Sequence, residues 1–125
     1  MQSHDPFANE LLQIDEGTSA DGVNQSHVDV RPELLNGGGI VHGGVTFSLI
    51  DQSMGDALMS LGGDWAANTT VELKINYLLP ISDGRIDCES RVLRAGRRIG
   101  VVEADVHNDG RLVAKAIGTY AFIKR

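Results

Sequence analysis

The sequence predicts an α+β domain in which an antiparallel sheet of five or six strands wraps around one long central helix. Two patterns indicate this fold class. In the middle of the chain, apolar residues recur at spacings of three and four, as on the buried face of a helix. Beyond them the apolar period changes to two, and turn signals divide the chain into long segments, as in a sheet. With 125 residues, 42% of them hydrophobic, we expect residues 1–125 to form one domain.

The N-terminal part has the least regular pattern. Residues 7–12 are compatible with a short helix, and residues 23–30 alternate weakly as a strand. Eight of the fifteen glycines then gather within residues 37–63. We expect the central helix to extend from Gly43 to about Leu61, a length of about 28 Å at 1.5 Å per residue. Two consecutive glycines follow and would end it.

Four strands are expected after the helix. Their approximate limits are 66–79, 85–95, 97–107 and 111–123. The last three are joined by short connections, of which Asn108-Asp109-Gly110 is a strong hairpin signal, so an antiparallel meander is the natural topology. One helix cannot cover such a sheet. Its edges and remaining apolar surface therefore predict a two-fold homodimer that continues the sheet.

Composition excludes several classes of protein. The net charge of −6 and the scarcity of aromatic residues (5%) argue against a nucleic-acid-binding surface. The longest uncharged run, residues 34–50, has 17 residues and five glycines, so no membrane span is expected. Cys88 is the only cysteine, which rules out an intrachain disulfide, and no spacing suggests a metal site. Without a secretion-signal pattern at its start, we expect a cytoplasmic protein.

The charges are divided unevenly along the chain. Residues 1–73 hold eleven acidic residues and one basic residue, whereas residues 74–125 hold six acidic and ten basic residues. Four arginines fall within eight positions of the basic part: Arg91, Arg94, Arg97 and Arg98. This cluster would attract a small anionic ligand, and solvated strand charges explain it about equally well.

The start of the central helix is the first candidate for chemistry. His42 precedes Gly43 and Gly44, where a helix exposes unpaired N–H groups and the positive end of its dipole. Without a Cβ, these glycines let a ligand oxygen approach the amides, as in an oxyanion hole. A tight turn before the helix is the alternative interpretation.

Asp51 is the second candidate, because a carboxylate in the middle of a helix with apolar neighbours is costly unless it is solvated, paired or in a cleft. A surface position is the alternative. Asp51 follows Gly43 by eight residues, about 12 Å along one helix, whereas a base must come within about 3 Å of the atom it serves. If both act on one carbonyl, Asp51 must come from a second subunit whose helix is antiparallel to the first.

These residues resemble the hotdog-fold acyl-CoA thioesterases of the PaaI-like, phenylacetate-degradation branch. The resemblance extends from about Asn36 to Phe122. Its motifs are Asn36, His42-Gly43-Gly44, Asp51, the segment Thr70-Val71-Glu72-Leu73-Lys74-Ile75-Asn76-Tyr77, Gly96-Arg97-Arg98, Leu112-Val113-Ala114 and Gly118-Thr119-Tyr120. The combined spacing is specific, whereas a single piece such as His-Gly-Gly would be weak evidence.

The resemblance implies catalytic roles. The Gly43 amide, assisted by the Asn36 side chain, would hold the thioester carbonyl, and His42 would orient the loop and the substrate. Asp51 of the partner subunit would be the general base for water or the nucleophile. Thr70 would help to position the water, as a Ser or Thr does in related enzymes.

The resemblance also implies substrate contacts and an assembly. Arg97 and Arg98 would meet the coenzyme A phosphates. Gly44, Phe47 and Met54 are further candidate substrate-binding residues, and the depth of the acyl pocket would depend on side chains such as Phe47 and Met54. Aryl, phenylacetyl and medium-chain acyl groups are all compatible with this resemblance. The family forms homodimers or dimer-of-dimers tetramers, and neither a cofactor nor a metal is implied.

We therefore expect an acyl-CoA thioesterase that releases a carboxylic acid and coenzyme A. Two alternatives stay open. A hotdog hydratase or dehydratase acting on acyl thioesters would hydrate or dehydrate the acyl chain without releasing thiol. A non-catalytic acyl-CoA binding or sensing module would bind the thioester without turnover.

Overall fold

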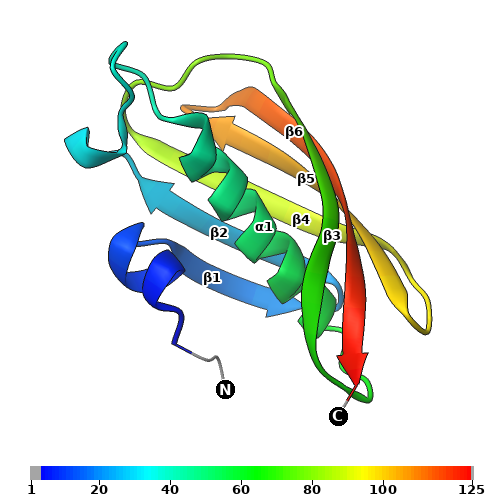
Figure 1. The fold of residues 1–125 in the computed structure, drawn as a ribbon. Helices are drawn as coiled ribbons and strands as arrows, with labels where there is room; N and C mark the ends of the chain where they lie inside the picture. The colour runs from blue at the N-terminus through cyan, green and yellow to red at the C-terminus, as the bar shows by residue number, and fades with distance from the viewer. Residues whose placement is uncertain (1–3, 125) are drawn as a thin grey trace.

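The computed structural model describes residues 4–124 and consists of one curved, six-stranded antiparallel sheet with a single long helix on its concave face (Figure 1). The strand order is β1-β2-β4-β5-β6-β3. The elements are η1 (Pro6–Leu11), β1 (Asp15–Ala20), β2 (Val23–Asp29), η2 (Pro32–Leu34), α1 (Gly43–Met59), β3 (Trp65–Tyr77), β4 (Arg85–Ala95), β5 (Ile99–Asn108) and β6 (Arg111–Lys124). The predicted α+β class, with a sheet wrapped around one helix, is confirmed.

The expected elements are present, with two additions, the strand β1 and the short helix η2. Helix α1 begins at Gly43 as predicted and ends two residues before Leu61. The strand that the sequence did not reveal is β1, whose six residues show no apolar alternation and are almost all exposed. It forms because the left-handed turn at Asp21 and Gly22, with φ values of 52° and 83°, folds the chain back onto β2.

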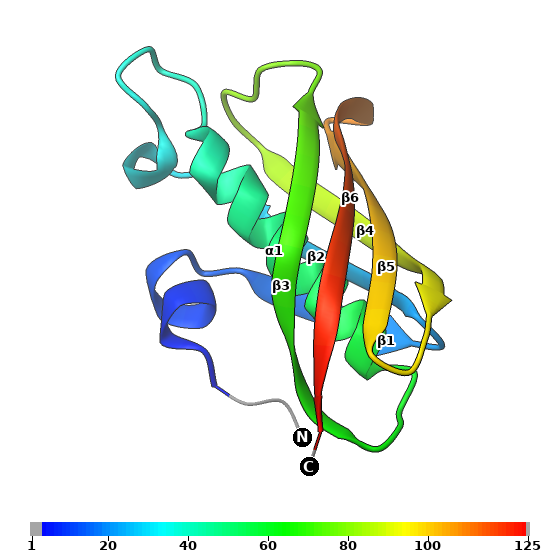
Figure 2. The same ribbon diagram turned by 45° about the vertical axis from the view of Figure 1, so that its right-hand side comes forward.

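The C-terminal half forms the predicted meander β4-β5-β6, and its last turn contains Asp109 and Gly110 in the left-handed region. Strand β3 does not join the meander through β4. It crosses to the far side and pairs with β6, so that β3 and β1 are the two edges of the sheet. Figure 2 shows β3 and β6 side by side, running across α1.

Two glycines let the helix approach the sheet. A Cβ on Gly100 of β5 would lie 2.5 Å from a methyl carbon of Leu58, and a Cβ on Gly118 of β6 would lie 2.9 Å from the sulfur of Met54. Both helix side chains are fully buried. Leu58 and Met54 therefore occupy the space above the two strands that larger residues would fill.

A buried polar cluster joins the other side of α1 to the sheet. The Ser53 hydroxyl donates to Oδ1 of Asn24 on β2 at 2.6 Å and lies 2.8 Å from the hydroxyl of Ser90 on β4. All three residues are completely buried. Because buried polar groups are stable only when hydrogen-bonded, these contacts define the rotation of α1 about its axis.

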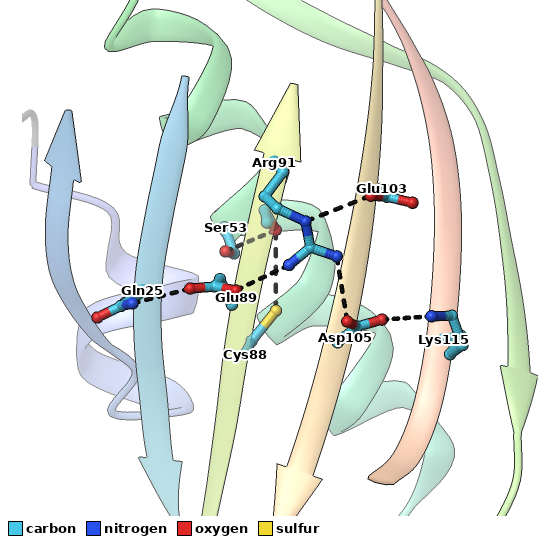
Figure 3. A network of polar contacts seen from close by, with 9 residues as sticks. Gln25, Ser53, Cys88, Glu89, Arg91, Glu103, Asp105 and Lys115 are labelled. Atoms are coloured by element: carbon cyan, nitrogen blue, oxygen red, sulfur yellow. Dashed lines mark hydrogen bonds and ion pairs between the residues drawn. The ribbon is translucent and has the colours of Figure 1, made fainter. Parts of the chain in front are cut away.

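The opposite face of the sheet carries a network of charges (Figure 3). Arg91 bridges Glu89 on its own strand to Glu103 and Asp105 on β5, and Lys115 of β6 lies 2.8 Å from Asp105. Thus one of the four clustered arginines is engaged in ion pairs that join neighbouring strands.

A second carboxyl of α1, Asp56, faces the N-terminal segment. Its Oδ2 is buried and has no hydrogen-bond partner within residues 4–124. Burial and the neighbouring Glu16 carboxylate raise the pKa of Asp56 from 3.8 to about 7. The contact between α1 and β1 therefore contains a carboxyl that is uncharged at mildly acidic pH.

In the described part of the chain, no helix has the length and apolarity that a membrane crossing needs.

Replacing Asp56 with Asn is expected to stabilise the fold at alkaline pH. The folded-state pKa of Asp56 lies above its ordinary value. Its contribution to the free energy of unfolding is therefore complete below about pH 4 and is lost as the pH rises through 7. Asn stays uncharged throughout. After allowance for solvent screening, we expect a gain of about 1–2 kcal/mol at pH 8 and little gain at pH 4.

Urea unfolding at the two pH values measures this difference. Asp64→Asn, which alters an exposed carboxyl, is the matched control and should follow the wild type. An Asp56→Asn variant with the same pH dependence as the wild type would contradict the prediction.

Helix α1 packs closely on β5 at Gly100. We therefore expect Gly100→Ala to destabilise the fold by about 1–3 kcal/mol, because the new Cβ overlaps the buried Leu58 side chain. Gly96→Ala is the control: its Cβ would be 3.4 Å from the nearest atom, an ordinary contact. Thermal or urea unfolding of both variants tests this, and equal stabilities would disprove the proposed overlap.

Candidate active site

The loop before α1 is held by the side chain of Asn36. Its Oδ1 accepts the N–H of Gly38 at 2.8 Å and that of Ile40 at 3.4 Å, and the Gly39 N–H donates to the Asn36 carbonyl. With φ at 81°, Gly39 has a conformation that favours glycine. Because Oδ1 is engaged within the loop, the Nδ2 end of Asn36 is the part that can donate to a ligand.

His42 is the N-cap of α1. Its Nδ1 accepts the Gly44 N–H at 2.9 Å, which places the proton of the neutral ring on Nε2. Among residues 4–124, the Gly43 N–H has no hydrogen-bond partner. The hydroxyl of Tyr77, at the end of β3, donates to the Gly43 carbonyl at 2.7 Å. The first turn of α1 is thus held at its carbonyl, while the Gly43 amide is left for a ligand.

Asn36, Gly43 and Tyr77 line one cavity of about 330 Å³, together with the apolar segment 78–81. The structure therefore brings together two of the residues predicted to hold a carbonyl. His42 and Gly44, on either side of Gly43 in the sequence, are both exposed and do not line this cavity.

Asp51 follows Gly43 by eight residues on α1 and is half-buried. Two hydroxyl groups donate hydrogen bonds to its carboxylate. Thr70 of β3 donates to Oδ1 at 2.7 Å, and Tyr120 of β6 donates to the same oxygen at 2.6 Å. Burial, followed by the Asp51 carboxylate, raises the pKa of the Tyr120 phenol far above its usual range, so Tyr120 remains a donor.

A bulge in β3 makes the Thr70 contact possible. Simple alternation places Thr70 on the face opposite to Leu73 and Ile75, which pack against the core. The register between β3 and β6 shifts between Thr70 and Glu72, and this shift turns Thr70 toward the helix. Val71, in the shifted stretch, is 62% exposed.

The carboxylate of Asp51 opens into a second cavity, of about 610 Å³. Its lining includes Thr70 and Tyr120, and also the carboxyls of Asp5, Glu16 and Asp56. Gly43 and Asn36 do not line it. Within one chain, the two candidate centres therefore open into different cavities, as their separation along the helix predicts.

The predicted anion-binding arginines line a third cavity. Arg94, Arg97 and Arg98 surround a hollow of about 460 Å³ at the β4–β5 connection. Within residues 4–124, no carboxylate pairs with any of them, in contrast to Arg91. In the same part of the chain, no group of three His, Cys, Asp or Glu side chains is arranged to hold a metal ion.

The two remaining predicted residues lie in different surroundings. Phe47 is 40% exposed, one helical turn before Asp51, and is available for contact with a ligand or another chain. Met54 is completely buried and packs toward Gly118 in the core. In the single chain, Met54 therefore serves helix packing, and its predicted contact with an acyl group stays a prediction.

Sequence reasoning did not identify Tyr77 and Tyr120 as site residues. In the sequence, Tyr77 falls at the end of one long strand and Tyr120 within another. At such positions an aromatic ring usually packs in the core. Only the pairing of β3 with β6 and the position of α1 show that each hydroxyl reaches the helix.

Comparisons with known proteins identify the family of this chain. The model of the thioesterase superfamily matches residues 38–115, more than half of the chain. A solved structure of a conserved protein from Pseudomonas aeruginosa is 44% identical, with a TM-score of 0.88 and 92% of each chain covered. A mutant of the phenylacetic acid degradation protein PaaI from Thermus thermophilus is 26% identical, with a TM-score of 0.84, and 94% of this chain and 98% of that chain are covered.

A curated relative is the medium/long-chain acyl-CoA thioesterase YigI of Salmonella typhimurium, which is 30% identical over 97 residues. The match includes 65% of this chain and 61% of YigI, so the chain spans less than two thirds of that relative. The family match and the structural similarity to a PaaI protein confirm the resemblance inferred from the motifs. The chain belongs to the thioesterase superfamily and has its hotdog fold.

Proposed function

We propose that the protein is a thioesterase that hydrolyses acyl-CoA in a site shared by two copies of the chain. The observation that supports this most strongly is the presentation of Asp51: its carboxylate faces a cavity while Thr70 and Tyr120 hold one of its oxygens. The Gly43 amide at the helix start, which has no partner within residues 4–124, supplies the complementary group, a donor for a carbonyl oxygen.

The proposed reaction needs these two centres close together. A water molecule attacks the thioester carbon, and Asp51 of the partner subunit accepts the proton of that water. The carbonyl oxygen gains negative charge, which the Gly43 N–H and the Asn36 amide stabilise. The carbon–sulfur bond then breaks, and the proton passes to the sulfur, which gives a carboxylic acid and coenzyme A. Direct attack by the carboxylate, followed by hydrolysis of the anhydride, is the variant that the resemblance leaves open.

Two features favour a shared site. Eight residues of helix separate Gly43 from Asp51 by about 12 Å, which no aspartate side chain spans. The edge strand β3 also exposes large hydrophobic side chains, with Val71 at 62% and Tyr77 at 55% exposure. A two-fold axis beside β3 would pair the two edges and set the helices antiparallel, so that each Gly43 faces the carboxylate of the other chain. A dimer is therefore part of the proposal, and a dimer of dimers is compatible with it.

The remaining predicted contacts concern the ends of the substrate. Arg97 and Arg98, which have no carboxylate partner within residues 4–124, suit the phosphates of coenzyme A. The first turn, with His42 and Gly44, would border the thioester, and the exposed ring of Phe47 would meet the acyl group. The acyl class, whether aryl, phenylacetyl or medium-chain, is decided where the two chains meet.

Asp51→Asn is expected to lower kcat for acyl-CoA hydrolysis by about 10²–10⁴-fold, because the amide cannot accept a proton or attack carbon. The side chain keeps its size, so assembly should be unchanged. Thiol release from a panel of acyl-CoA substrates measures the loss, and size-exclusion chromatography checks the assembly.

The conservative change Asp64→Asn on the exposed loop after α1 is the control and should retain full activity. Full activity of Asp51→Asn would refute the assignment. Hydration of an enoyl-CoA without thiol release would identify a hydratase instead, and tight acyl-CoA binding without turnover would identify a sensor.

Subunit mixing is expected to restore activity to two inactive variants. Gly43→Pro removes the amide proton at the first helical position, where proline is tolerated, and His42 already has the extended conformation that precedes proline, with φ −59° and ψ 133°. A hybrid of Gly43→Pro and Asp51→Asn chains has one intact site and one doubly altered site. Equal co-expression should therefore recover about a quarter of wild-type activity per chain.

Each variant expressed alone is the control, since it has no intact site. Native mass spectrometry establishes that hybrids have formed. Hybrids without activity would exclude a site shared between two chains.

A further inference from the structure

We propose that Tyr120 is a positioning residue that determines which oxygen of Asp51 reacts. Its phenol, together with Thr70, occupies Oδ1, so that Oδ2 is the oxygen that accepts the proton or attacks the thioester. This inference rests on the proposed function, and it assigns a role to an almost completely buried residue that lines the Asp51 cavity.

The hydrogen bonds to Asp51 are all on one side of the carboxylate. The Tyr120 hydroxyl is 2.6 Å from Oδ1 and 3.1 Å from the backbone carbonyl of Asp51, and the Thr70 hydroxyl is 2.7 Å from Oδ1. Within residues 4–124, no donor reaches Oδ2. An oxygen that accepts two short hydrogen bonds is the poorer base, which leaves Oδ2 as the more basic oxygen.

The sheet places the two donors together. Thr70 and Tyr120 are direct partners in the register between β3 and β6, and the neighbouring bulge turns Thr70 toward α1. Gly118 gives the Tyr120 ring its room, because a Cβ there would lie 3.2 Å from a ring carbon. Tyr120 is 1% exposed, so its ring is enclosed by the fold.

The charges around Asp51 explain why neutral donors are needed. The titratable groups that line its cavity are Asp56 on the same helix, Glu16 on β1, Asp5 before η1 and Tyr120 on β6. None of the described lining residues is basic. The hydroxyls of Tyr120 and Thr70 are therefore the groups that donate hydrogen bonds to its carboxylate.

The decisive variant is Tyr120→Phe, which keeps the buried ring and removes only the donor. We expect kcat to fall about tenfold, with KM changed less than about twofold, because Asp51 is misdirected while substrate contacts are kept. With one donor lost, the Asp51 carboxylate is less stable, so the acidic limb of the pH profile of kcat/KM should move up by about one unit.

Tyr77→Phe is the matched control. It removes the other tyrosine hydroxyl, which donates to the neutral Gly43 carbonyl. Whatever its effect on rate, it should leave the acidic limb in place. An unchanged limb and a kcat within about twofold of wild type in Tyr120→Phe would overturn the inference.

A second measurement separates this inference from the proposed function. The carboxyl carbon of Asp51, assigned by its loss in Asp51→Asn, can be titrated by ¹³C NMR in the absence of substrate. The Asp51 pKa should be higher in Tyr120→Phe than in the wild type even if no acyl-CoA is hydrolysed. Should Tyr120→Phe not fold, Thr70→Val removes the other donor to Oδ1 and should raise the same pKa, whereas Thr70→Ser should restore it. Equal pKa values in the folded variants and the wild type would refute the role.

Discussion

The position of α1 within the curved sheet is the constraint on which the rest of the structure depends. Gly100 and Gly118 let the helix approach two strands, and the buried Ser53 hydroxyl joins it to two others through Asn24 and Ser90. Apolar packing alone would allow a helix to slide or turn, whereas hydrogen bonds between completely buried groups have one good geometry. Asp51 lies three and seven residues before Met54 and Leu58, so it shares the helix face that packs on the sheet, where Thr70 and Tyr120 reach its carboxylate.

Strands β3 and β6 complete this arrangement with hydroxyl groups. Thr70, Tyr120 and Tyr77 each donate to α1, two of them to the Asp51 carboxylate and one to the Gly43 carbonyl. The site thus orients a carboxylate with neutral donors in a cavity whose other titratable groups are acidic. A cation beside Asp51 would hold its charge more strongly, but it would also weaken the carboxylate as a base. Hydroxyl donors orient the Asp51 carboxylate without placing a positive charge beside it.

The acidic N-terminal half and the basic C-terminal half have different places in the fold. The acidic groups Asp5, Glu16 and Asp56 gather near the C-terminal part of α1, where the pKa of Asp56 is raised to about 7. The basic cluster divides: Arg91 joins strands on the outer face, and Arg94, Arg97 and Arg98 surround a hollow at the β4–β5 connection. Neighbours in the sequence therefore differ in role because adjacent residues of a strand, or of its turn, face different surroundings.

The sequence by itself determined the fold class, the start of α1 and the meander β4-β5-β6, because apolar periodicity and turn residues are local signals. It also pointed to Asn36, Gly43 and Asp51, because uncharged glycine-rich segments and an acid within an apolar helix are unusual on their own. It did not reveal β1, whose pairing depends on a turn rather than on apolar alternation, nor the partnership of β3 with β6. The contacts of Tyr120 and Tyr77 with the helix could not be found in this way, and neither could the packing of Met54 against Gly118. The direction in which a strand residue points depends on register and bulges, and these are decided by contacts between segments far apart in the chain.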